Sequence, residues 1–370
     1  MTDARPVVPW DVMDAFLVDA FVGYGVPRKD AIICSDVLLE SDRRGIESHG
    51  CNRFKPIYID RIVAGIQKPV TKIDVIRETP TTAVLDANDG MGMAASHAAM
   101  EMAIDKAKQC GLSMIAVRNS THYGIAGYWA TMATKQNMIG ITGTNARPSI
   151  APTFGVENML GTNPLTVGFP TDEEFPFMLD CATSITQRGR IEYYARAGQP
   201  TPSGMVIGRD GTAKTDSEQI LSDLNSGQAA LAPLGGIGEE MGGYKGYGYA
   251  TVVEVLSAAL QAGSFLKALS DKDNGKWKPC HLGHFFLVVS PEAFLGTEQF
   301  KKTTGDILRA LRASAKAPGQ ERIYTAGEKE YLTWLERKDK GVPINEAVQK
   351  EILAIRDELG LGCRFPFEKE

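Results

Sequence analysis

Two short segments carry the residue types best suited to acid–base chemistry. The first, SHG at 48–50, contains Ser48 and His49, and the second, NSTHYG at 119–124, contains His122. The chain has five histidines in 370 residues, and two of them lie in these polar, glycine-flanked segments. Histidine titrates near neutrality, so it suits proton transfer to and from an oxygen on carbon. The competing interpretation is that both histidines are structural and that Ser48 caps a turn.

Arg53 adds a second chemical function beside the first segment. It follows His49 by four residues, a spacing that places both side chains on one face if the segment is helical. A guanidinium can bind a carboxylate through two parallel hydrogen bonds. A proton carrier beside an arginine that binds carboxylate is the minimum that interconversion of a 2-hydroxy acid and a 2-oxo acid requires.

The composition predicts a globular cytoplasmic protein. Hydrophobic residues make up 43% of the chain, charged residues 23%, and the net charge is −5, which gives no general attraction to nucleic acid or membranes. The sequence lacks an apolar run of about 18 residues, the length of a membrane span, and its N-terminus lacks the apolar core of a signal peptide. The six scattered cysteines show no regular pairing and are expected to be reduced thiols.

The hydrophobic pattern predicts helices at both ends and an α/β region between them. Residues 9–64 have helical spacing of apolar residues, and from about residue 81 strands alternate with helices. This alternation favours an α/β sheet with at least partly parallel pairing. The expected strands are 82–86, 112–117, 138–142 and 285–289, and the expected helices are 94–109, 126–136, 249–262 (buried), 297–313 and 344–358. We expect residues 198–216 to form a long loop, and the two helical ends to pack together and flank the sheet.

A dinucleotide fingerprint is the first cofactor motif to test. GMGMAA at 90–95 follows an expected strand and opens an expected helix, as a Rossmann motif would. The next strand ends Val117-Arg118-Asn119, without the acidic residue that binds the ribose. The alternative is a glycine turn that packs a helix onto a sheet. Other candidate segments are 160–164, 179–184 and 242–248, where glycines on both sides of Lys245 leave its ammonium open to a phosphate.

Together these segments resemble the malate/L-lactate dehydrogenase family of the non-Rossmann type, which also includes ureidoglycolate and L-sulfolactate dehydrogenases and diketogulonate reductases. The resemblance spans residues 10–358 and rests on five motifs in the family's order: ESHGCNRF at 47–54, NSTHYGIAGYWA at 119–130, GTNP at 161–164, LDCATS at 179–184 and GGYKGYG at 242–248. It implies a homodimer with a non-Rossmann nicotinamide-binding sheet domain. The corresponding division is a helical segment at 1–75, an α/β domain at 76–294 and a C-terminal helical segment at 295–370.

The resemblance also implies roles for individual residues. Ser48, His49, Arg53 and His122 would line the substrate site, with one of the two histidines carrying the proton. Asn145 would lie beside the substrate or the nicotinamide. The residues implied at the cofactor are Gly161, Thr162, Asn163, Asp180, Ala182, Lys245, Gly327 and Glu328.

The implied activity is reversible hydride transfer between a nicotinamide cofactor and a small L-2-hydroxy acid. We expect NAD, with NADP possible, and malate as the preferred substrate. Lactate, sulfolactate, ureidoglycolate and, by reduction of a C=N bond, a cyclic imine are the alternatives. A nicotinamide-binding regulator without catalysis would be expected to lose the histidines, and both are present.

Three features do not follow the family pattern or its chemistry. Residues 184–205 are unusually basic and aromatic. Three roles are open for their arginines: binding the 2′-phosphate of a cofactor, forming a dimer contact or binding a more anionic substrate. Residues 270–276 match no family motif and are expected to form a solvated surface loop. Cys280, His281 and His284 offer three zinc ligands without an obvious fourth, whereas the family uses no metal.

Overall fold

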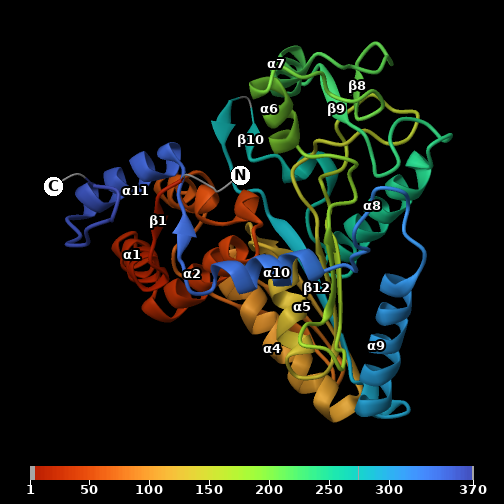
Figure 1. The fold of residues 1–370 in the computed structure, drawn as a ribbon. Helices are drawn as coiled ribbons and strands as arrows, with labels where there is room; N and C mark the ends of the chain where they lie inside the picture. The colour runs from red at the N-terminus through yellow and green to blue at the C-terminus, as the bar shows by residue number, and fades with distance from the viewer. Residues whose placement is uncertain (1–4, 274, 369–370) are drawn as a thin grey trace.

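A seven-stranded mixed sheet forms the centre of the computed structural model, which describes residues 5–273 and 275–368 (Figure 1). Within these residues β3 and β4 are the only parallel neighbours in that sheet, and the other pairs are antiparallel. Partly parallel pairing is therefore confirmed, for one pair. In order across the sheet the strands are β2 (Asp74–Glu78), β3 (Thr82–Asp86), β4 (Leu112–Ser120), β12 (Leu282–Val289), β5 (Ile139–Thr144), β6 (Leu165–Phe169) and β7 (Phe177–Cys181).

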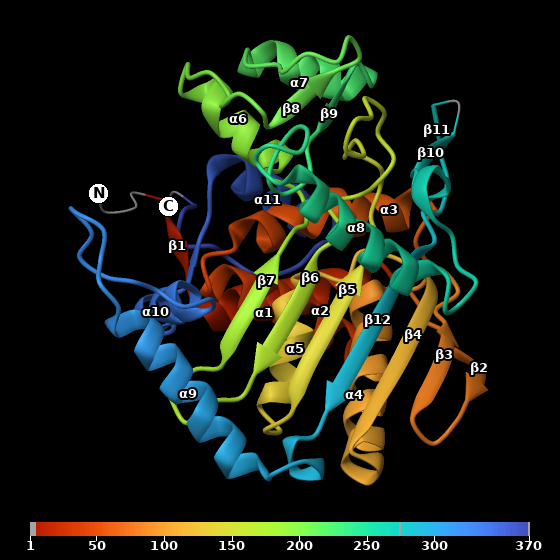
Figure 2. The ribbon, with the colours of Figure 1, turned by 90° about the vertical axis from the view of Figure 1, so that its right-hand side faces the viewer.

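Helices cover both faces of this sheet. On one face, α4 (Gly92–Cys110) packs on β4 and β12, and α5 (Ala126–Thr134) packs on β5, β6 and β7. On the other face, α8 (Gly243–Ala258) crosses β4, β12 and β5 (Figure 2). The helix α4 also connects β3 to β4, because two parallel strands need a crossover rather than a hairpin.

The two ends of the chain pack together, as the sequence predicts. The strands β1 (Val7–Val8) and β13 (Val342–Pro343) pair antiparallel, and Phe16 meets Phe365 edge to face at a centroid distance of 5.2 Å. This region shares the main apolar core with α4 and β4. Its helices are α1 (Trp10–Gly23), α2 (Arg28–Arg43), α3 (Asp60–Val63), α10 (Glu328–Arg337) and α11 (Glu346–Leu359).

A smaller layer stands above the sheet, as Figure 2 shows. It consists of α6 (Arg188–Arg196), α7 (Ser217–Ser226) and the two-stranded sheet of β8 (Val206–Gly208) and β9 (Ala229–Leu231). A second apolar core that includes Ile191, Val206 and Ile220 holds these elements together. The expected loop at 198–216 is thus interrupted by a strand, because Val206 and its neighbours are buried in this core.

Three further elements differ from the sequence-based expectations. The helix expected at 249–262 begins at Gly243, and one face of it is exposed rather than buried. The expected surface loop at 270–276 contains β10 (Lys272–Asp273) and β11 (Lys276–Trp277), which form a hairpin. The helix α10 is not predicted, although its apolar residues have helical spacing, whereas α9 (Thr297–Ala313) is confirmed residue for residue. Within the described residues, no helix combines the length and the apolarity that crossing a membrane would require.

Candidate active site

The segment that carries His49 consists of two short 3-10 turns, η1 (Glu47–His49) and η2 (Cys51–Arg53), rather than a continuous helix. The expected i,i+4 face is therefore not formed, and Arg53 folds back so that its Nε donates to the Ser48 carbonyl at 2.6 Å. Buried Asp42 holds the junction of the two turns by accepting the Cys51 backbone N–H at 2.8 Å. A Cβ at Gly50 would lie 2.1 Å from the Asp42 carboxylate, so only glycine fits between the turns.

His122 follows β4 and is held in place by its neighbours. Its Nδ1 lies 2.7 Å from the Tyr58 hydroxyl and 3.2 Å from the Gly124 backbone nitrogen. The preceding residue, Thr121, donates its hydroxyl to the Gly90 carbonyl and accepts the Gly92 N–H, each at 2.9 Å. The position of His122 is therefore fixed on both sides by backbone contacts.

The fold brings the two predicted histidines together. Their rings lie nearly parallel, with centroids 5.7 Å apart and an interplanar angle of 21°. Nδ1 of His49 lies 2.9 Å from the Ser48 hydroxyl, and Nδ1 of His122 meets Tyr58, which leaves Nε2 of each ring for other contacts. The structure thus places Ser48, His49, Arg53 and His122 in one site, and it adds Tyr58.

The electrostatic surroundings keep both imidazoles neutral at pH 7. Burial lowers the pKa of His49 to about 4, and the charge of Arg53 lowers it further in the same direction. Burial is also the main cause that puts the pKa of His122 well below its usual range, followed by His49 and by the charges of Arg61 and Arg53. A neutral imidazole accepts a proton, so the pair is prepared to act as a base.

The glycine fingerprint serves packing rather than dinucleotide binding. A Cβ at Gly92 would lie 2.2 Å from the Thr121 carbonyl oxygen, and one at Gly90 would lie 2.8 Å from Thr71. The backbone of the α4 N-terminus thus presses directly against the segment that ends in His122. These contacts fill the space that a pyrophosphate would need, so of the two interpretations the glycine turn is the one that the structure supports.

Asn145 lies at the end of β5 and is fully buried. Its side-chain oxygen accepts the Gly283 N–H at 2.8 Å, and its amide donates to the Ser264 carbonyl at 3.1 Å. Both functional atoms are thus engaged inside the protein, and the side chain ties β5 to the start of β12. Any contribution of Asn145 to substrate binding would come from this positioning.

The two histidines among the three candidate zinc ligands have different partners. His284 is buried between Ser120 and Thr144, at 2.8 Å from each hydroxyl, and His281 pairs with Asp89 at 2.7 Å. Within the described residues no three side chains of the metal-ligating types gather in one place. His284 instead links β4 to β5, the two strands that lead to His122 and Asn145.

The first group of residues implied at the cofactor lies at the N-terminus of α5. Asp180 accepts the Gly127 N–H at the start of α5 at 2.7 Å and the Thr166 hydroxyl at 2.9 Å. Burial nevertheless raises the pKa of this carboxyl. Asp180, Gly127 and Gly327 line a cavity of about 320 Å³, which also includes Tyr324 and Glu330. This cavity extends from α5 to the N-terminus of α10.

A second group of implied cofactor residues meets above β6 and β7. The Thr183 N–H donates to the Thr162 carbonyl at 3.0 Å, so Thr162 and Ala182 belong to adjoining backbones. Thr183 in turn accepts the Leu234 N–H, and a Cβ at Gly246 would lie 2.2 Å from the Leu234 oxygen. Lys245 is therefore next to this junction. Its side chain is exposed and has no carboxylate partner among the described residues.

Three other implied residues are engaged within the chain. A Cβ at Gly161 would lie 2.4 Å from the Ala146 oxygen, so this glycine permits close backbone packing. Asn163 is fully buried and donates to Glu254 at 2.8 Å. Glu328 is fully buried and is bound by Arg322 and the Thr325 N–H; burial would raise the pKa of its carboxyl, but these partners outweigh it and lower the pKa.

Two of the three arginines of the basic segment are also engaged within the chain. Arg188 binds Glu192 and Asn225, and the Arg190 guanidinium stacks on the rings of Tyr193 and Tyr194 at about 5 Å. They pack within the α6–α7 layer rather than in the cavity beside Asp180.

Tyr58 and Arg61 are the residues that sequence reasoning misses. Tyr58 lies in the π-helical turn η3 (Phe54–Ile59), and Arg61 follows in α3. Their three-residue spacing, with Tyr58 on an otherwise apolar face, is the signal available in the sequence.

A nicotinamide dinucleotide fits these residues. The cavity between Asp180 and Gly327 is lined by Ile125, three residues after His122 in the chain, and Lys245 has an exposed ammonium without a carboxylate partner in the described part of the chain, which suits a phosphate. Two neighbouring histidines lie beside an arginine, and the sheet lacks a Rossmann phosphate loop. These features are those of a dehydrogenase of the non-Rossmann class.

The chain belongs to the malate/L-lactate dehydrogenase family, whose model matches residues 8–353. It is 42% identical over 354 residues to a malate dehydrogenase of Pyrococcus horikoshii, covering 96% of each chain. It is 37% identical to an L-sulfolactate dehydrogenase of Methanocaldococcus jannaschii, covering 94% of this chain and 95% of that one. Among solved structures, malate dehydrogenase of Entamoeba histolytica superposes with a TM-score of 0.92 at 41% identity, covering 98% and 100% of the two chains. The family expected from the five motifs is therefore confirmed, and so is its α/β fold.

Proposed function

We propose that this protein is an NAD-dependent dehydrogenase that interconverts an L-2-hydroxy acid and its 2-oxo acid, with malate as the preferred substrate. The observation that carries the proposal is the stacked pair of neutral imidazoles, His49 and His122, beside Arg53. The similarity to proteins named malate dehydrogenase favours malate over lactate.

Arg53 is the residue proposed to hold the C1 carboxylate of the substrate. Its Nε is committed to the Ser48 carbonyl, which orients the guanidinium. The two terminal nitrogens have no hydrogen-bond partner in the described part of the chain, so both are available for a bidentate contact. This contact would place C2 and its oxygen at a fixed position relative to the imidazoles.

His122 is proposed to exchange the proton with the C2 oxygen. During oxidation the neutral ring takes the hydroxyl proton on Nε2, and during reduction the protonated ring returns it. To take this proton on Nε2, the neutral ring carries its own hydrogen on Nδ1, where the Tyr58 hydroxyl accepts it, and the protonated ring keeps the same hydrogen bond. A bound nicotinamide would supply the hydride acceptor or donor at this site.

The proposed preference for NAD rests on the charges around the cavity beside Asp180. Glu330 and Asp180 line it, and carboxylates suit a ribose diol better than a 2′-phosphate. The cations at its edge are already engaged, since Arg44 binds Glu40 at 2.7 Å and Lys329 stacks over Tyr324 at 4.9 Å.

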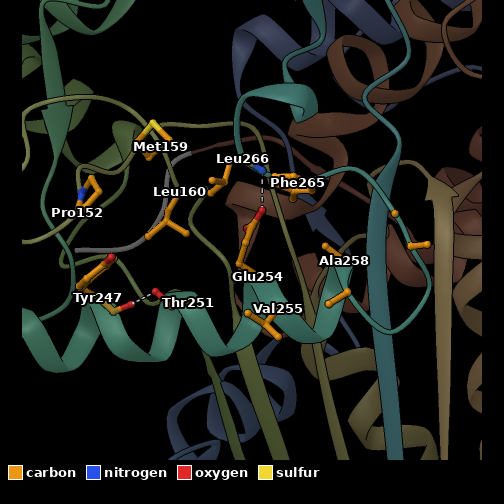
Figure 3. A pocket seen from close by; sticks show the side chains of 13 residues that line it. Pro152, Met159, Leu160, Tyr247, Thr251, Glu254, Val255, Ala258, Phe265 and Leu266 are labelled. Atoms are coloured by element: carbon orange, nitrogen blue, oxygen red, sulfur yellow. Dashed lines mark hydrogen bonds between the residues drawn. The ribbon is translucent and has the colours of Figure 1, made fainter.

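We also propose a homodimer that buries the exposed face of α8. This face carries Tyr249, Val252 and Val255, each about half exposed, and continues into Leu260 and Phe265. It borders an apolar cavity of about 480 Å³ between α8 and the segments around Leu160 and Leu266 (Figure 3). Contiguous exposed apolar surface of this kind is typical of a protein interface. The six free cysteines support a reducing cytoplasm as its location.

The decisive experiment offers malate, lactate, sulfolactate and ureidoglycolate to the purified protein with NAD or NADP, and a cyclic imine with NADH or NADPH. The expected result is NAD-dependent oxidation with the highest kcat/KM for malate. Reduction of the imine without turnover of any 2-hydroxy acid would favour the alternative reaction on the same scaffold. Absence of any nicotinamide-dependent turnover would refute the proposal.

A further inference from the structure

One buried carboxylate joins two arginines beside the site. Asp271, with a side chain 4% exposed, binds Arg61 Nη2 at 3.0 Å through one oxygen and Arg147 Nη1 at 3.4 Å through the other. The three residues come from the base of the β10–β11 hairpin, from α3 and from the loop after β5. Figure 2 shows the hairpin standing beside α3. The segment expected to be a solvated loop is thus anchored in the interior.

Two elements connect this cluster to the surroundings of His122. Arg61 lies one helical turn after Tyr58, whose hydroxyl is 2.7 Å from His122 Nδ1. Arg147 follows Asn145 by two residues, and Asn145 is tied to Gly283 next to buried His284. Both arginines therefore stand on elements that position the proposed proton carrier and its surroundings.

The charges of the cluster do not cancel. Two guanidiniums share one carboxylate, which leaves one net positive charge. The Arg61 side chain is 15% exposed, and its Nε is buried without a hydrogen-bond partner among the described residues. Arg147 is 63% exposed and makes a single long contact, so most of its donors face outward. An anion that binds Arg147 would satisfy this surplus charge.

We propose that Arg147 binds the second anionic group of the substrate, a carboxylate or a sulfonate at the end remote from C1, and that Asp271 positions Arg147 for this contact. The inference rests on the proposed function and extends it. Arg53 would hold the C1 carboxylate and Arg147 the far one, so the site selects dianionic 2-oxo acids over pyruvate. A planar guanidinium suits either oxyanion through paired hydrogen bonds.

The test compares wild type with Arg147→Gln in the reduction of oxaloacetate, sulfopyruvate and pyruvate. The expected result is a loss of about 10- to 100-fold in kcat/KM for the dianionic substrate or substrates that the wild type uses, from one charged hydrogen-bonded contact, with pyruvate changed less than about threefold. The two dianions distinguish carboxylate from sulfonate. Arg196→Gln, which removes an exposed arginine at the end of α6, is the charge-matched control and should change none of them.

Two further variants separate positioning from folding. Asp271→Asn should raise KM for the dianion while leaving kcat within about twofold, and Arg147→Lys should restore part of the lost selectivity. Circular dichroism of each variant checks that it folds. If Arg147→Gln lowers kcat/KM for oxaloacetate and for pyruvate by the same factor, or lowers neither, the inference is overturned while the proposed function stands. A wild-type protein that reduces no 2-oxo acid overturns the proposed function and this inference with it.

Discussion

At the scale of single residues, the site separates proton transfer from substrate binding. His122→Ala removes the proposed proton carrier, and we expect kcat to fall by about 10²- to 10⁴-fold with nicotinamide binding retained. Arg53→Lys keeps the charge but loses the planar fork, so KM for the acid should rise more than kcat falls. Steady-state kinetics and titration of NADH fluorescence measure both effects. If His122→Ala keeps nearly full turnover, His49 is the proton carrier.

The lowered pKa values of His49 and His122 predict an unusual pH profile. Oxidation requires a neutral imidazole, and in the free enzyme both rings stay neutral well below pH 6.5. We therefore expect kcat/KM for malate oxidation to remain level from pH 8 to pH 6 and to fall only at more acidic pH. An inflection at 6.5 or above, measured under constant ionic strength, would contradict this electrostatic description.

Single residues also show which parts of the site can be predicted from the sequence. His49, His122 and Arg53 are predictable because their chemistry is conspicuous and glycines surround them. Tyr58 and Arg61 are not predictable, because their roles depend on their position relative to His122 in the fold. The contact between Tyr58 and His122 joins residues that are 64 positions apart in the chain. Glu328 and Asn163 illustrate the reverse case, since their motifs suggest a ligand but their polar groups bind the protein itself.

At the scale of elements, the glycine turn before α4 supports the catalytic segment. Gly92→Ala would place a methyl group 2.2 Å from the Thr121 carbonyl, so backbone must move. We expect a loss of about 1–3 kcal/mol in the free energy of unfolding, as overpacked sites show, together with lower activity through displacement of His122. Denaturant unfolding measures the first effect. Gly189→Ala in α6, where a Cβ meets nothing within 4 Å, is the control and should be neutral or slightly stabilising.

The exposed face of α8 provides the test of the proposed dimer. Val255→Glu places a charge beside the apolar cavity, and burying it in an interface without a partner is costly. We expect the mass measured by light scattering to fall from that of a dimer to 40.1 kDa, the mass of one chain. Ile307→Glu, at an exposed position of α9, should leave the assembly intact. Wild-type protein that is monomeric at micromolar concentration would refute the dimer.

Elements differ in how well local pattern predicts them. The helix α9 is amphipathic along its whole length, so its bounds follow from the spacing of its apolar residues. The position of β12 does not follow from any local pattern, because it inserts between β4 and β5 from more than 130 residues away. The buried Asp271 is likewise hidden in a polar run, and only its pairing with Arg61 distinguishes it.

At the scale of the whole molecule, buried histidines make the fold sensitive to acid. The unfolded chain binds protons at His284 below pH 6.5, whereas burial lowers the native pKa to about 3. The unfolded state thus holds more protons in this range, and stability falls with decreasing pH, with a slope of up to about 1.4 kcal/mol per pH unit for each such group. His49 and His122 act in the same direction.

Asp42 acts in the opposite direction, because burial raises its native pKa to about 7 and protonation between pH 7 and 4 then favours the fold. Burial also raises the carboxyl pKa of Asp30, Asp180, Glu254 and Glu351, so these groups oppose the histidines too. We expect the histidines to dominate between pH 6.5 and pH 5, just below the ordinary imidazole pKa, and the free energy of unfolding to decrease over that range. His284→Gln should flatten this decrease, as measured by urea unfolding at successive pH values. His97→Gln, which alters a partly exposed histidine on α4, is the control. Equal slopes in wild type and His284→Gln would contradict the assignment.

The late arrival of β12 has a consequence for biosynthesis. During translation β4 and β5 emerge early, but the strand that separates them follows only after residue 281. Until then the two strands cannot take their final spacing, and the half-made sheet exposes edges to other chains. The same strand, through Gly283 and His284, fixes Asn145 and the approach to His122. A nascent chain therefore gains its catalytic geometry late in synthesis, and premature termination before β12 yields an inactive fragment prone to aggregation.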